Sequence, residues 1–394
     1  MAVDLLGSTR TGTRRVKIAV AAAGIASFAL LYAPQPVLPQ LAQQYHLDPG
    51  SASLAVSVAT GALAVAVLPI AALSEIIGRR PVIVTSVVAS AVLGLLLPLA
   101  PTYPVLLVLR AIQGVAIAGF PGVAAAYLVE QLGKTGVAAA VGAMIAGNSI
   151  GGMLGRLSAG FSAEALGYHG ALIVVGAVGL LFSLITVVAL PPALPREPRH
   201  APVKRALRGV GAALSKPVLL AQYAVAMLVM GVFVAMYNAA GFRLTGHPLD
   251  LPPAIASLVF LAYAIGSVSS MTMGRLVGRF GRVRSAIGGL LLTAAGVLLT
   301  LPDSLPAVIL GFLVLTAGFF AVHTVANGWT AAEAPANARG QASGTYTLTY
   351  YLGSSVGGTL GSVVFAHAGW SWLVAATCAW LVAAVVVVGA VARR

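Results

Sequence analysis

The chain divides into about twelve long apolar stretches, and the segments between them hold most of its charged residues. The stretches cover residues 17–40, 52–74, 81–100, 104–129, 136–161, 169–191, 217–241, 253–273, 284–301, 305–330, 340–366 and 370–391. Each stretch is long enough to cross the hydrocarbon core of a bilayer, which takes about 20 helical residues. The pattern therefore predicts an all-α membrane protein with twelve transmembrane helices.

Composition supports a membrane protein, because 59% of the residues are hydrophobic and only 8% are charged. Soluble globular domains do not have this profile. The net charge of +14 could suggest nucleic acid, but the cations follow the loops, so we expect anionic lipid headgroups as their partners instead. The single cysteine, Cys378, excludes a disulfide framework or a cysteine metal site and is predicted to pack as a small hydrophobe.

The basic residues predict the orientation. If the N-terminus is placed inside, all but three of the 23 Lys and Arg residues fall on the inner side. The exceptions are Arg243 in an outer loop and Arg110 and Arg156 within apolar stretches. Because inner loops of membrane proteins are enriched in Lys and Arg, we expect both termini in the cytoplasm.

The loops suggest four parts in a monomeric chain. Residues 1–15 form a polar tail predicted to be disordered, residues 16–191 a first six-helix bundle and residues 217–391 a second. Residues 192–216 form the longest inner loop, which contains prolines and six cations. We interpret this loop as a flexible hinge that can hold an interfacial helix.

The two halves repeat each other. Gly78 and Gly281 are 203 residues apart, and so are Glu130 and Glu333. A second series recurs at a spacing of 206 residues and pairs Gly147, Gly151, Gly152 and Gly155 with Gly353, Gly357, Gly358 and Gly361. Three matched features argue for a duplicated six-helix unit. Both copies begin on the inner side, so a pseudo-twofold axis along the membrane normal and a central cavity are expected.

The loop after the second stretch carries the most specific motif. Residues 71–81 read Ala-Ala-Leu-Ser-Glu-Ile-Ile-Gly-Arg-Arg-Pro, which resembles the Gly-x-Leu-Ala-Asp-Arg-x-Gly-Arg-Arg/Lys signature of the major facilitator superfamily (MFS). Glu75 occupies the acidic position, and Gly78, Arg79 and Arg80 match. The second copy, residues 274–282, has Gly278 at the acidic position. The resemblance implies the MFS fold and transport by alternating access.

These loop residues are predicted to form a gate. An arginine can bind a carboxylate through two hydrogen bonds, so Arg79 is expected to pair with Glu130 and Arg282 with Glu333. Glu75 would face the start of the stretch 340–366, where a helix N-terminus favours a carboxylate by ~0.3–1 kcal/mol. Such contacts would hold the inner side closed and break when the halves rock. The alternative is a set of solvated topology charges. The predicted gating residues are Glu75, Gly78, Arg79, Arg80, Glu130, Arg279, Arg282 and Glu333.

The glycines of the fifth stretch resemble the Gly-x-x-x-Gly-Pro-x-x-Gly-Gly motif of the antiporter branch, with Asn148 in place of the proline. Glycines four residues apart share one helix face and allow close helix approach. Two readings remain open: tight helix packing, or a leak-proof interface between the two halves.

Three residues are candidates for proton coupling. Arg110, in Arg-Ala-Ile-Gln-Gly, matches a family motif linked to coupling, and its burial in lipid would cost at least ~2.5–3.5 kcal/mol without a partner. Arg156 lies at a similar depth; alternatively, it extends toward outer headgroups. None of the nine acidic residues lies deep in a stretch, which leaves His323 as the deep titratable group. The alternative for His323 is a hydrogen-bonded core residue.

Polar and aromatic residues within the stretches are candidates for binding substrate. They are Tyr32, Gln35, Gln113, Asn148, Tyr237, Asn238, Tyr263, His323, Asn327, Tyr346 and Tyr350. The sequence contains no phosphate-binding Gly-x-x-x-x-Gly-Lys-Ser/Thr loop, no Cys/His metal cluster and no catalytic constellation. We therefore expect no enzyme and no cofactor, with the proton gradient as the energy source.

The resemblance extends to the bacterial twelve-span drug/proton antiporters, with sugar-efflux and YnfM-type exporters nearby. It implies proton-coupled efflux of small organic molecules across a bacterial inner membrane. Two buried arginines without a buried acid favour neutral or anionic substrates. An organic-anion facilitator or importer, with Arg110 and Arg156 clamping the anion, is the main alternative. A membrane sensor or enzyme is a remote one.

Overall fold

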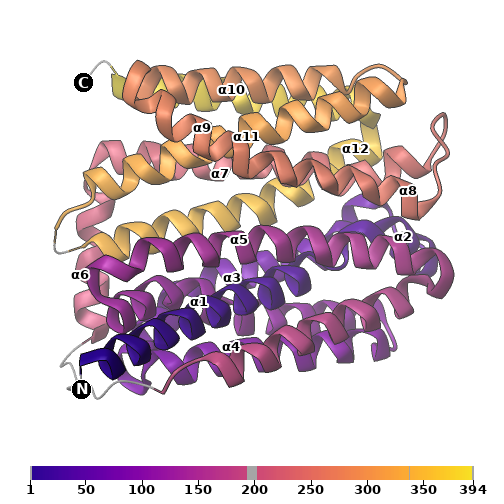
Figure 1. The fold of residues 1–394 in the computed structure, drawn as a ribbon. Coiled ribbons are helices and arrows are strands. Elements are labelled where there is room, and N and C mark those ends of the chain that lie inside the picture. The colour runs from indigo at the N-terminus through magenta and orange to yellow at the C-terminus, as the bar shows by residue number, and fades with distance from the viewer. Residues whose placement is uncertain (1, 193–201, 337, 393–394) are drawn as a thin grey trace.

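The computed structural model describes residues 2–192, 202–336 and 338–392, and all the regular elements of these residues are helices (Figure 1). In chain order they are α1 (Ala2–Tyr32), η1 (Gln35–Val37), α2 (Leu38–Tyr45), α3 (Pro49–Ile77), α4 (Arg79–Leu96), η2 (Leu97–Leu99), α5 (Tyr103–Ala189), α6 (Pro202–Leu214), α7 (Pro217–Thr245), α8 (Pro253–Ser257), η3 (Leu258–Tyr263), α9 (Ala264–Phe280), α10 (Arg282–Leu299), α11 (Leu305–Glu333) and α12 (Arg339–Ala392).

Twelve crossings result from ten apolar helical segments of the described chain. Two of these segments, Ala139–Ala189 with 51 residues and Arg339–Val391 with 53, are too long for one crossing. At about 1.5 Å per residue, each would extend more than twice the ~30 Å of a hydrocarbon core. Each turns back at a glycine with positive φ, at Gly167 (62°) and Gly369 (81°). The predicted number of spans is therefore confirmed.

The outer surface of the helices is apolar. Val65, Val108, Val188 and Val386 are 59–75% exposed although they lie in the middle or last turns of apolar helices. Water-soluble monomers rarely expose apolar side chains over so much of their surface. Lipid tails are the environment that these side chains fit, which supports a multi-pass membrane protein.

The first crossing differs from the predicted one at both ends. The backbone of α1 is already helical from Ala2, where the sequence predicted a disordered tail over residues 1–15. A helix that is stable in its apolar part extends at little cost, because propagation is far easier than nucleation. At its other end α1 stops at Tyr32, because Pro34 and Pro36 lack the N–H groups that would continue the ladder. The crossing continues through η1 and α2.

The inner connections of the two halves have the same geometry. Gly78 joins α3 to α4 with φ 93° and ψ 155°, and Gly281 joins α9 to α10 with φ 80° and ψ 166°. Residues with a side chain rarely adopt this conformation, so both positions require glycine. The structural equivalence of two residues 203 positions apart confirms the internal repeat.

The repeated glycines pack helices within each half. A Cβ atom on Gly147 would lie 2.3 Å from the carbonyl oxygen of Ala21 on α1. A Cβ atom on Gly151 would lie 2.5 Å from the Cα of Ile25 on the same helix. In the second half, a Cβ atom on Gly353 would lie 2.2 Å from the carbonyl oxygen of Met227 on α7. Helix packing is therefore the role of these glycines. The partner helices of Gly147, Gly151 and Gly353 belong to the same bundle as the glycine, whereas Gly358 also faces the other half, where its Cβ atom would lie 3.5 Å from Ser57 Oγ on α3.

The two halves meet along two seams. Along α3 and α12 the contact is continuous: Gly50 approaches Val363 at one end, Ser355 Oγ donates to the Ser57 carbonyl (2.7 Å), and Gly344 approaches Leu68 at the other end. The second seam joins α5 to α8 and η3. Here Gly160 packs against Ser257, where a Cβ atom would lie 2.1 Å from the Ser257 Cβ. Farther toward the inner connections, a Cβ atom on Gly142 of α5, or on Gly274 of α9, would meet open space.

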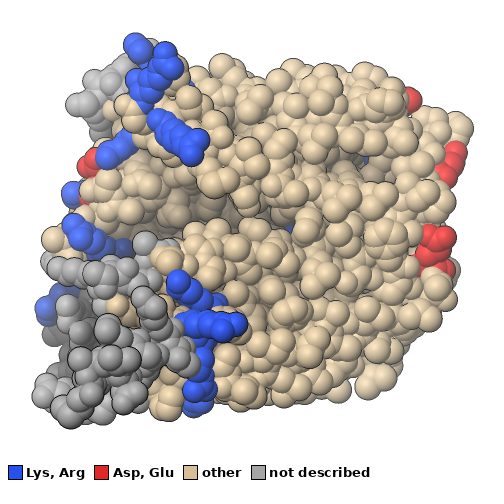
Figure 2. Space-filling view, viewed as in Figure 1, with Lys and Arg blue, Asp and Glu red and all other residues tan. Residues whose placement is uncertain are grey.

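Charge separates the two ends of the molecule. Figure 2 shows Lys and Arg gathered at the end that carries both termini in Figure 1; acidic residues are visible at both ends, and at the opposite end they are the main charged residues in view. We call these the basic end, marked by Arg79 and Arg282, and the opposite end, marked by Asp48 and Asp303. Figure 2 also shows a hollow between the two halves that reaches toward the basic end. The open part of the second seam lies on this side.

Candidate functional site

Arg156 forms the centre of a buried polar cluster between the two halves. Its side chain on α5 is 2% exposed; Nε donates to Gln35 Oε1 (2.6 Å) and Nη1 to the Gly152 carbonyl (2.7 Å). The guanidinium carbon lies 4.2 Å from the ring centre of Tyr32 and 4.5 Å from that of Tyr263. The alternative in which Arg156 extends to outer headgroups is wrong, because the side chain points into this cluster.

Gln35 connects Arg156 to the other half. While its Oε1 accepts from Arg156, its Nε2 donates to Oδ1 of Asn238 on α7 (2.7 Å). Both amide side chains are buried, so this hydrogen bond is shielded from water. The cluster therefore ties the two bundles together toward the opposite end of the molecule.

The charge of Arg156 has no acidic partner among the described residues, since no carboxylate forms an ion pair with it. Removing a charge from water costs several kcal/mol even in real, relaxed proteins. Two hydrogen bonds and the faces of two tyrosine rings offset part of this cost, because a cation is attracted to a ring face by ~0.5–2 kcal/mol. Among the described residues, no carboxylate therefore neutralises the positive charge of the site.

Aromatic rings of the second half form a continuous wall next to Arg156. Tyr263 lies 5.3 Å from Phe233 and 5.1 Å from Tyr237 between ring centres, and Phe233 stacks on Phe319 at 3.8 Å. The Tyr237 hydroxyl is paired with Thr316 Oγ1 (2.7 Å). Such rings offer a large apolar contact surface with polar edges. Phe233 and Phe319 are absent from the predicted substrate residues, which include tyrosines but no phenylalanine. The spacing of Phe233 from Tyr237 and of Phe319 from His323, four residues in each case, was the available signal.

His323 lies at the other end of this wall. Its Nδ1 is 3.0 Å from the Tyr346 hydroxyl, and its ring centre is 4.9 Å from that of Tyr350. These three side chains line a small pocket between α7, α11 and α12, with room for about one water molecule. The other lining residues are Val225, Ala226, Val229, Phe319, Val322 and Ala326. The structure thus brings together eight of the predicted substrate residues along one path: Tyr32, Gln35, Tyr237, Asn238, Tyr263, His323, Tyr346 and Tyr350.

Arg110 is separate from this path. It is fully buried inside the first half, where Nε donates to the Ala55 carbonyl (2.7 Å) and the terminal nitrogens donate to the Leu30 and Leu31 carbonyls and to Gln113 Oε1. The Leu30 carbonyl would normally accept from residue 34, which is a proline without an N–H. Arg110 therefore supplies a missing donor and joins α1, α3 and α5.

Three further predicted substrate residues also lie away from Arg156. Gln113 donates to the Ser90 carbonyl (2.9 Å) inside the first half. Asn148 packs its Oδ1 against Gly24 of α1, where a Cβ atom would come within 2.4 Å of it. Asn327 is exposed on α11. The structure does not bring these three side chains together with the central cluster.

Both predicted ion pairs at the basic end are present. Arg79 Nη1 lies 2.8 Å from Glu130 Oε1, and Arg282 Nη1 lies 2.9 Å from Glu333 Oε1. Arg79 also donates to the Ala126 carbonyl. Each pair joins neighbouring helices of one half, α4 to α5 or α10 to α11. The expectation that these pairs break when the halves rock is therefore wrong, because neither pair crosses between halves.

The remaining predicted gating residues surround these pairs. Arg80 Nε donates to the Leu190 carbonyl (3.4 Å), which ends α5. Arg279 lies over the ring of the neighbouring Phe280, with 5.3 Å from guanidinium carbon to ring centre. Glu75 is partly buried on the last turns of α3, and no ion pair joins it to another described residue. Gly78 supplies the turn described above.

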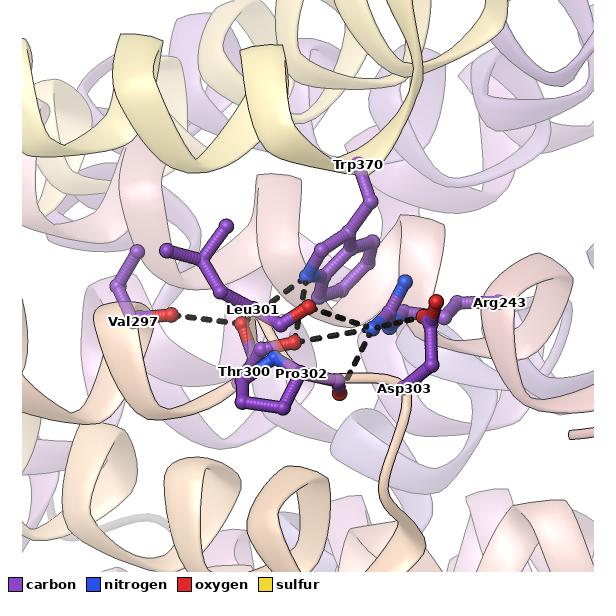
Figure 3. A network of polar contacts seen from close by, with 7 residues as sticks. All are labelled: Arg243, Val297, Thr300, Leu301, Pro302, Asp303 and Trp370. Atoms are coloured by element: carbon purple, nitrogen blue, oxygen red, sulfur yellow. Dashed lines mark hydrogen bonds and ion pairs between the residues drawn. The ribbon is translucent and has the colours of Figure 1, made fainter. Parts of the chain in front are cut away.

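A second arginine cluster lies at the opposite end (Figure 3). Arg243 stacks over Trp370, with 4.6 Å from the guanidinium carbon to the ring centre, and Nη2 lies 3.1 Å from Asp303 Oδ1. The same nitrogen donates to three carbonyls just beyond α10, those of Thr300, Leu301 and Pro302. Carbonyls at a helix C-terminus lack partners and carry partial negative charge. Arg243, which the sequence placed in an outer loop, lies in the last turn of α7 and caps α10.

These features define a membrane transporter built from two repeated six-helix bundles around a central site. The family model of the Major Facilitator Superfamily matches residues 20–247 and 244–394, and the chain belongs to this family. It is 37% identical to the MFS-type transporter YybF of Bacillus subtilis, with 92% of this chain and 90% of that protein covered. It is 36% identical to the inner membrane transport protein YnfM of Escherichia coli, with 96% and 91% covered.

A solved structure supports the fold. The bacterial homologue of the lysosomal transporter Spinster, in an inward-facing and unoccupied conformation, superposes with a TM-score of 0.79 over 96% of both chains. The sequence identity is 16%, so this similarity concerns the fold alone. The predicted MFS fold is confirmed.

Proposed function

We propose that the protein is a proton-coupled exporter of small organic molecules, neutral or anionic, which works by alternating access in a bacterial inner membrane. The observation that carries the proposal is Arg156, a buried cation between the halves without an acidic partner among the described residues. A permanently cationic substrate would find no counter-charge there, whereas a neutral or anionic one would not be repelled. The basic end, with both termini, faces the cytoplasm in this proposal.

Export is supported by a relative over part of the chain. The multidrug resistance protein MdtG of Enterobacter lignolyticus is 29% identical over 58% of this chain and 54% of its own length. The aromatic wall from Tyr263 to Phe319 suits the apolar bodies of such molecules. The ion pairs at the basic end act in this proposal by keeping each half rigid while the halves move against each other.

His323 is the proposed proton carrier. It lies within the membrane-spanning part of α11 and touches Tyr346, which can donate or accept a proton. Imidazole gains and loses a proton near neutral pH more readily than other side chains. Arg110 is the less suitable carrier, because its nitrogens donate to the carbonyls of Ala55, Leu30 and Leu31, and these acceptors stabilise the protonated guanidinium.

Transport in proteoliposomes tests the proposal. Vesicles with an imposed pH gradient are offered chloramphenicol, which is uncharged, or ethidium, a permanent cation. We expect gradient-dependent movement of the uncharged probe and much slower movement of ethidium. Robust ethidium transport without a response to the uncharged probe would overturn the substrate assignment. Movement of the uncharged probe that ignores the gradient would overturn proton coupling.

A histidine pair tests the proton carrier. His323→Ala is expected to lose the pH dependence of transport. His367 is exposed on α12, two residues before the turn at Gly369, and His367→Ala is expected to keep the pH dependence. Both variants are first checked for a single symmetric peak in size-exclusion chromatography. A wild-type pH profile in His323→Ala would remove His323 as the carrier.

A facilitator or importer of an organic anion is the second candidate, and it too is favoured by Arg156. The two candidates differ in charge movement and direction. An anion facilitator would carry current in the absence of a pH gradient. A proton-coupled exporter of a neutral molecule would carry current only when a pH gradient, or a gradient of its substrate, drives protons across the membrane. Electrical recording on the same proteoliposomes separates them.

A further inference from the structure

Arg156 is held by a neutral group in a place that suits an acid. The Gln35 amide oxygen lies 2.6 Å from Arg156 Nε, a distance typical of a charge-assisted hydrogen bond. One of the two oxygens of a carboxylate has the same geometry and a larger negative charge. Arginine binds carboxylates through two parallel hydrogen bonds, whereas Gln35 offers one acceptor. A carboxylate would therefore be the stronger partner at this position.

The same amide is also the link between the halves. Gln35 Nε2 donates to Asn238 Oδ1 (2.7 Å), and the two residues belong to different bundles. The amide nitrogen of Asn238, Nδ2, is buried and has no partner among the described residues, and the same is true of the Ser57 hydroxyl. A buried polar group without a partner costs ~1–3 kcal/mol. The closed arrangement thus leaves polar atoms unsatisfied around this link.

A path leads to Arg156 from the open side. On η3, Tyr263 is partly exposed and forms one wall of the Arg156 cluster. Close packing of α5 against the second half is present at Gly160, beyond Arg156, and is absent at Gly142. Arg156 therefore stands where the open part of the seam ends.

We propose that Arg156 binds the carboxylate of an organic acid with an apolar or aromatic body, and that this carboxylate replaces the Gln35 amide and so releases the Gln35–Asn238 link between the halves. This inference rests on the proposed function and assigns its substrate class. Gln35 acts as an internal competitor that holds the site closed while it is empty. Binding the substrate and loosening the outer closure then become one event, because both use the same amide.

Equilibrium binding to the purified full-length protein tests this inference without a membrane gradient. The probes are benzoate, 1-naphthoate and hexanoate, with benzamide as the uncharged counterpart of benzoate and inorganic phosphate as a different anion. We expect saturable binding of at least one carboxylate and at least ten-fold weaker binding of benzamide and phosphate. Absence of binding by all three carboxylates, or equal binding of benzoate and benzamide, or preference for phosphate overturns the proposal.

Two variants of Gln35 give opposite expectations. Gln35→Ala removes the competitor and is expected to tighten carboxylate binding several-fold. Gln35→Glu places a carboxylate of the protein next to Arg156 and is expected to weaken the binding of the carboxylate probes at least ten-fold. The matched control is Gln222→Ala, which removes another buried glutamine, on α7, and is expected to leave binding unchanged. Weaker binding in Gln35→Ala would contradict competition by the amide.

Arg156→Gln is expected to lose carboxylate binding while keeping the weak binding of benzamide. If this variant fails to fold, the opposite effects of the two Gln35 variants still decide the proposal. Failure of the proposed function is distinguishable, because it appears as absent or gradient-independent transport in proteoliposomes. Carboxylate binding that follows these rules without transport would support the site and contradict the exporter.

Discussion

Replacing Gly151 by alanine tests how the two repeats hold their helices together. The added Cβ atom would lie 2.5 Å from the Cα and from the carbonyl oxygen of Ile25, whereas ordinary contact begins at 3.4 Å. Helices α1 and α5 must therefore separate by about 0.9 Å at this point. The obstacle is backbone, which cannot rotate away as a flexible side chain could. Overpacking of this kind costs ~1–3 kcal/mol.

The matched control lies on the same helix. An alanine at Gly142 would meet open space, and alanine favours a helix over glycine by up to ~1 kcal/mol. We therefore expect Gly151→Ala to unfold or aggregate at a lower temperature than wild type and Gly142→Ala at an equal or higher one. Heating the purified protein and measuring the remaining monodisperse fraction by size-exclusion chromatography compares them. Equal midpoints for the two variants would refute the close-packing argument.

The second half provides an independent repetition. A Cβ atom on Gly357 would lie 2.3 Å from the Cα of Gly231 on α7, which corresponds to Ile25 on α1 at the spacing of 206 residues. Gly357→Ala should therefore destabilise the protein at least as much as Gly151→Ala. A clear loss in one half and none in the other would contradict the equivalence of the repeats.

Three further predictions concern polar groups. Glu130→Gln should lower the midpoint of thermal unfolding more than Glu333→Gln. The partner side chain Arg79 is 11% exposed whereas Arg282 is 41% exposed, and exposed ion pairs contribute only about 0–1 kcal/mol to stability. Equal decreases of the two midpoints would contradict this ranking. Arg110→Gln should strongly reduce the recovery of monodisperse protein, since each buried carbonyl left without a donor costs ~1–3 kcal/mol; wild-type recovery would show that water replaces the arginine. Asp48→Ala should cost about 1 kcal/mol at neutral pH, because the carboxylate caps α3 by accepting from the N–H and hydroxyl of Ser51. Those hydrogen bonds lower the pKa of Asp48, so its contribution is complete above the unfolded pKa of about 4 and is lost as the pH falls further; a constant difference down to pH 2 would contradict this cause.

The features that repeat were predictable from the sequence. The pairs Arg79–Glu130 and Arg282–Glu333 follow from charges at matched positions beside glycines that end a helix. The number of crossings follows from apolar length. This holds even for α12, which contains two crossings joined by a turn at Gly369. Such features depend on local sequence and on the thickness of a bilayer, so one chain suffices to derive them.

The composition of the central site was only partly predictable. Arg156 was recognised as a buried cation, but its partners lie 121 residues away at Gln35 and, through that amide, a further 203 residues away at Asn238. No periodicity of one helix indicates which face of another it meets. The different roles of Arg110 and Arg156 could not be predicted for the same reason. Arg110 meets a carbonyl freed by Pro34, whereas Arg156 meets side chains of both halves.

The two seams between the halves differ, and this difference constrains how the molecule can move. The α3–α12 seam is closed from Gly50 to Gly344, whereas the other seam is closed only from Arg156 toward Gly160. The ion pairs at the basic end lie within halves and survive any rigid movement of one half against the other. Contacts that cross between the halves, such as Gln35–Asn238, Ser355–Ser57 and Gly160–Ser257, are the ones that such a movement changes. Because Gln35–Asn238 belongs to the central cluster, a molecule bound there can alter the free energy of the movement directly.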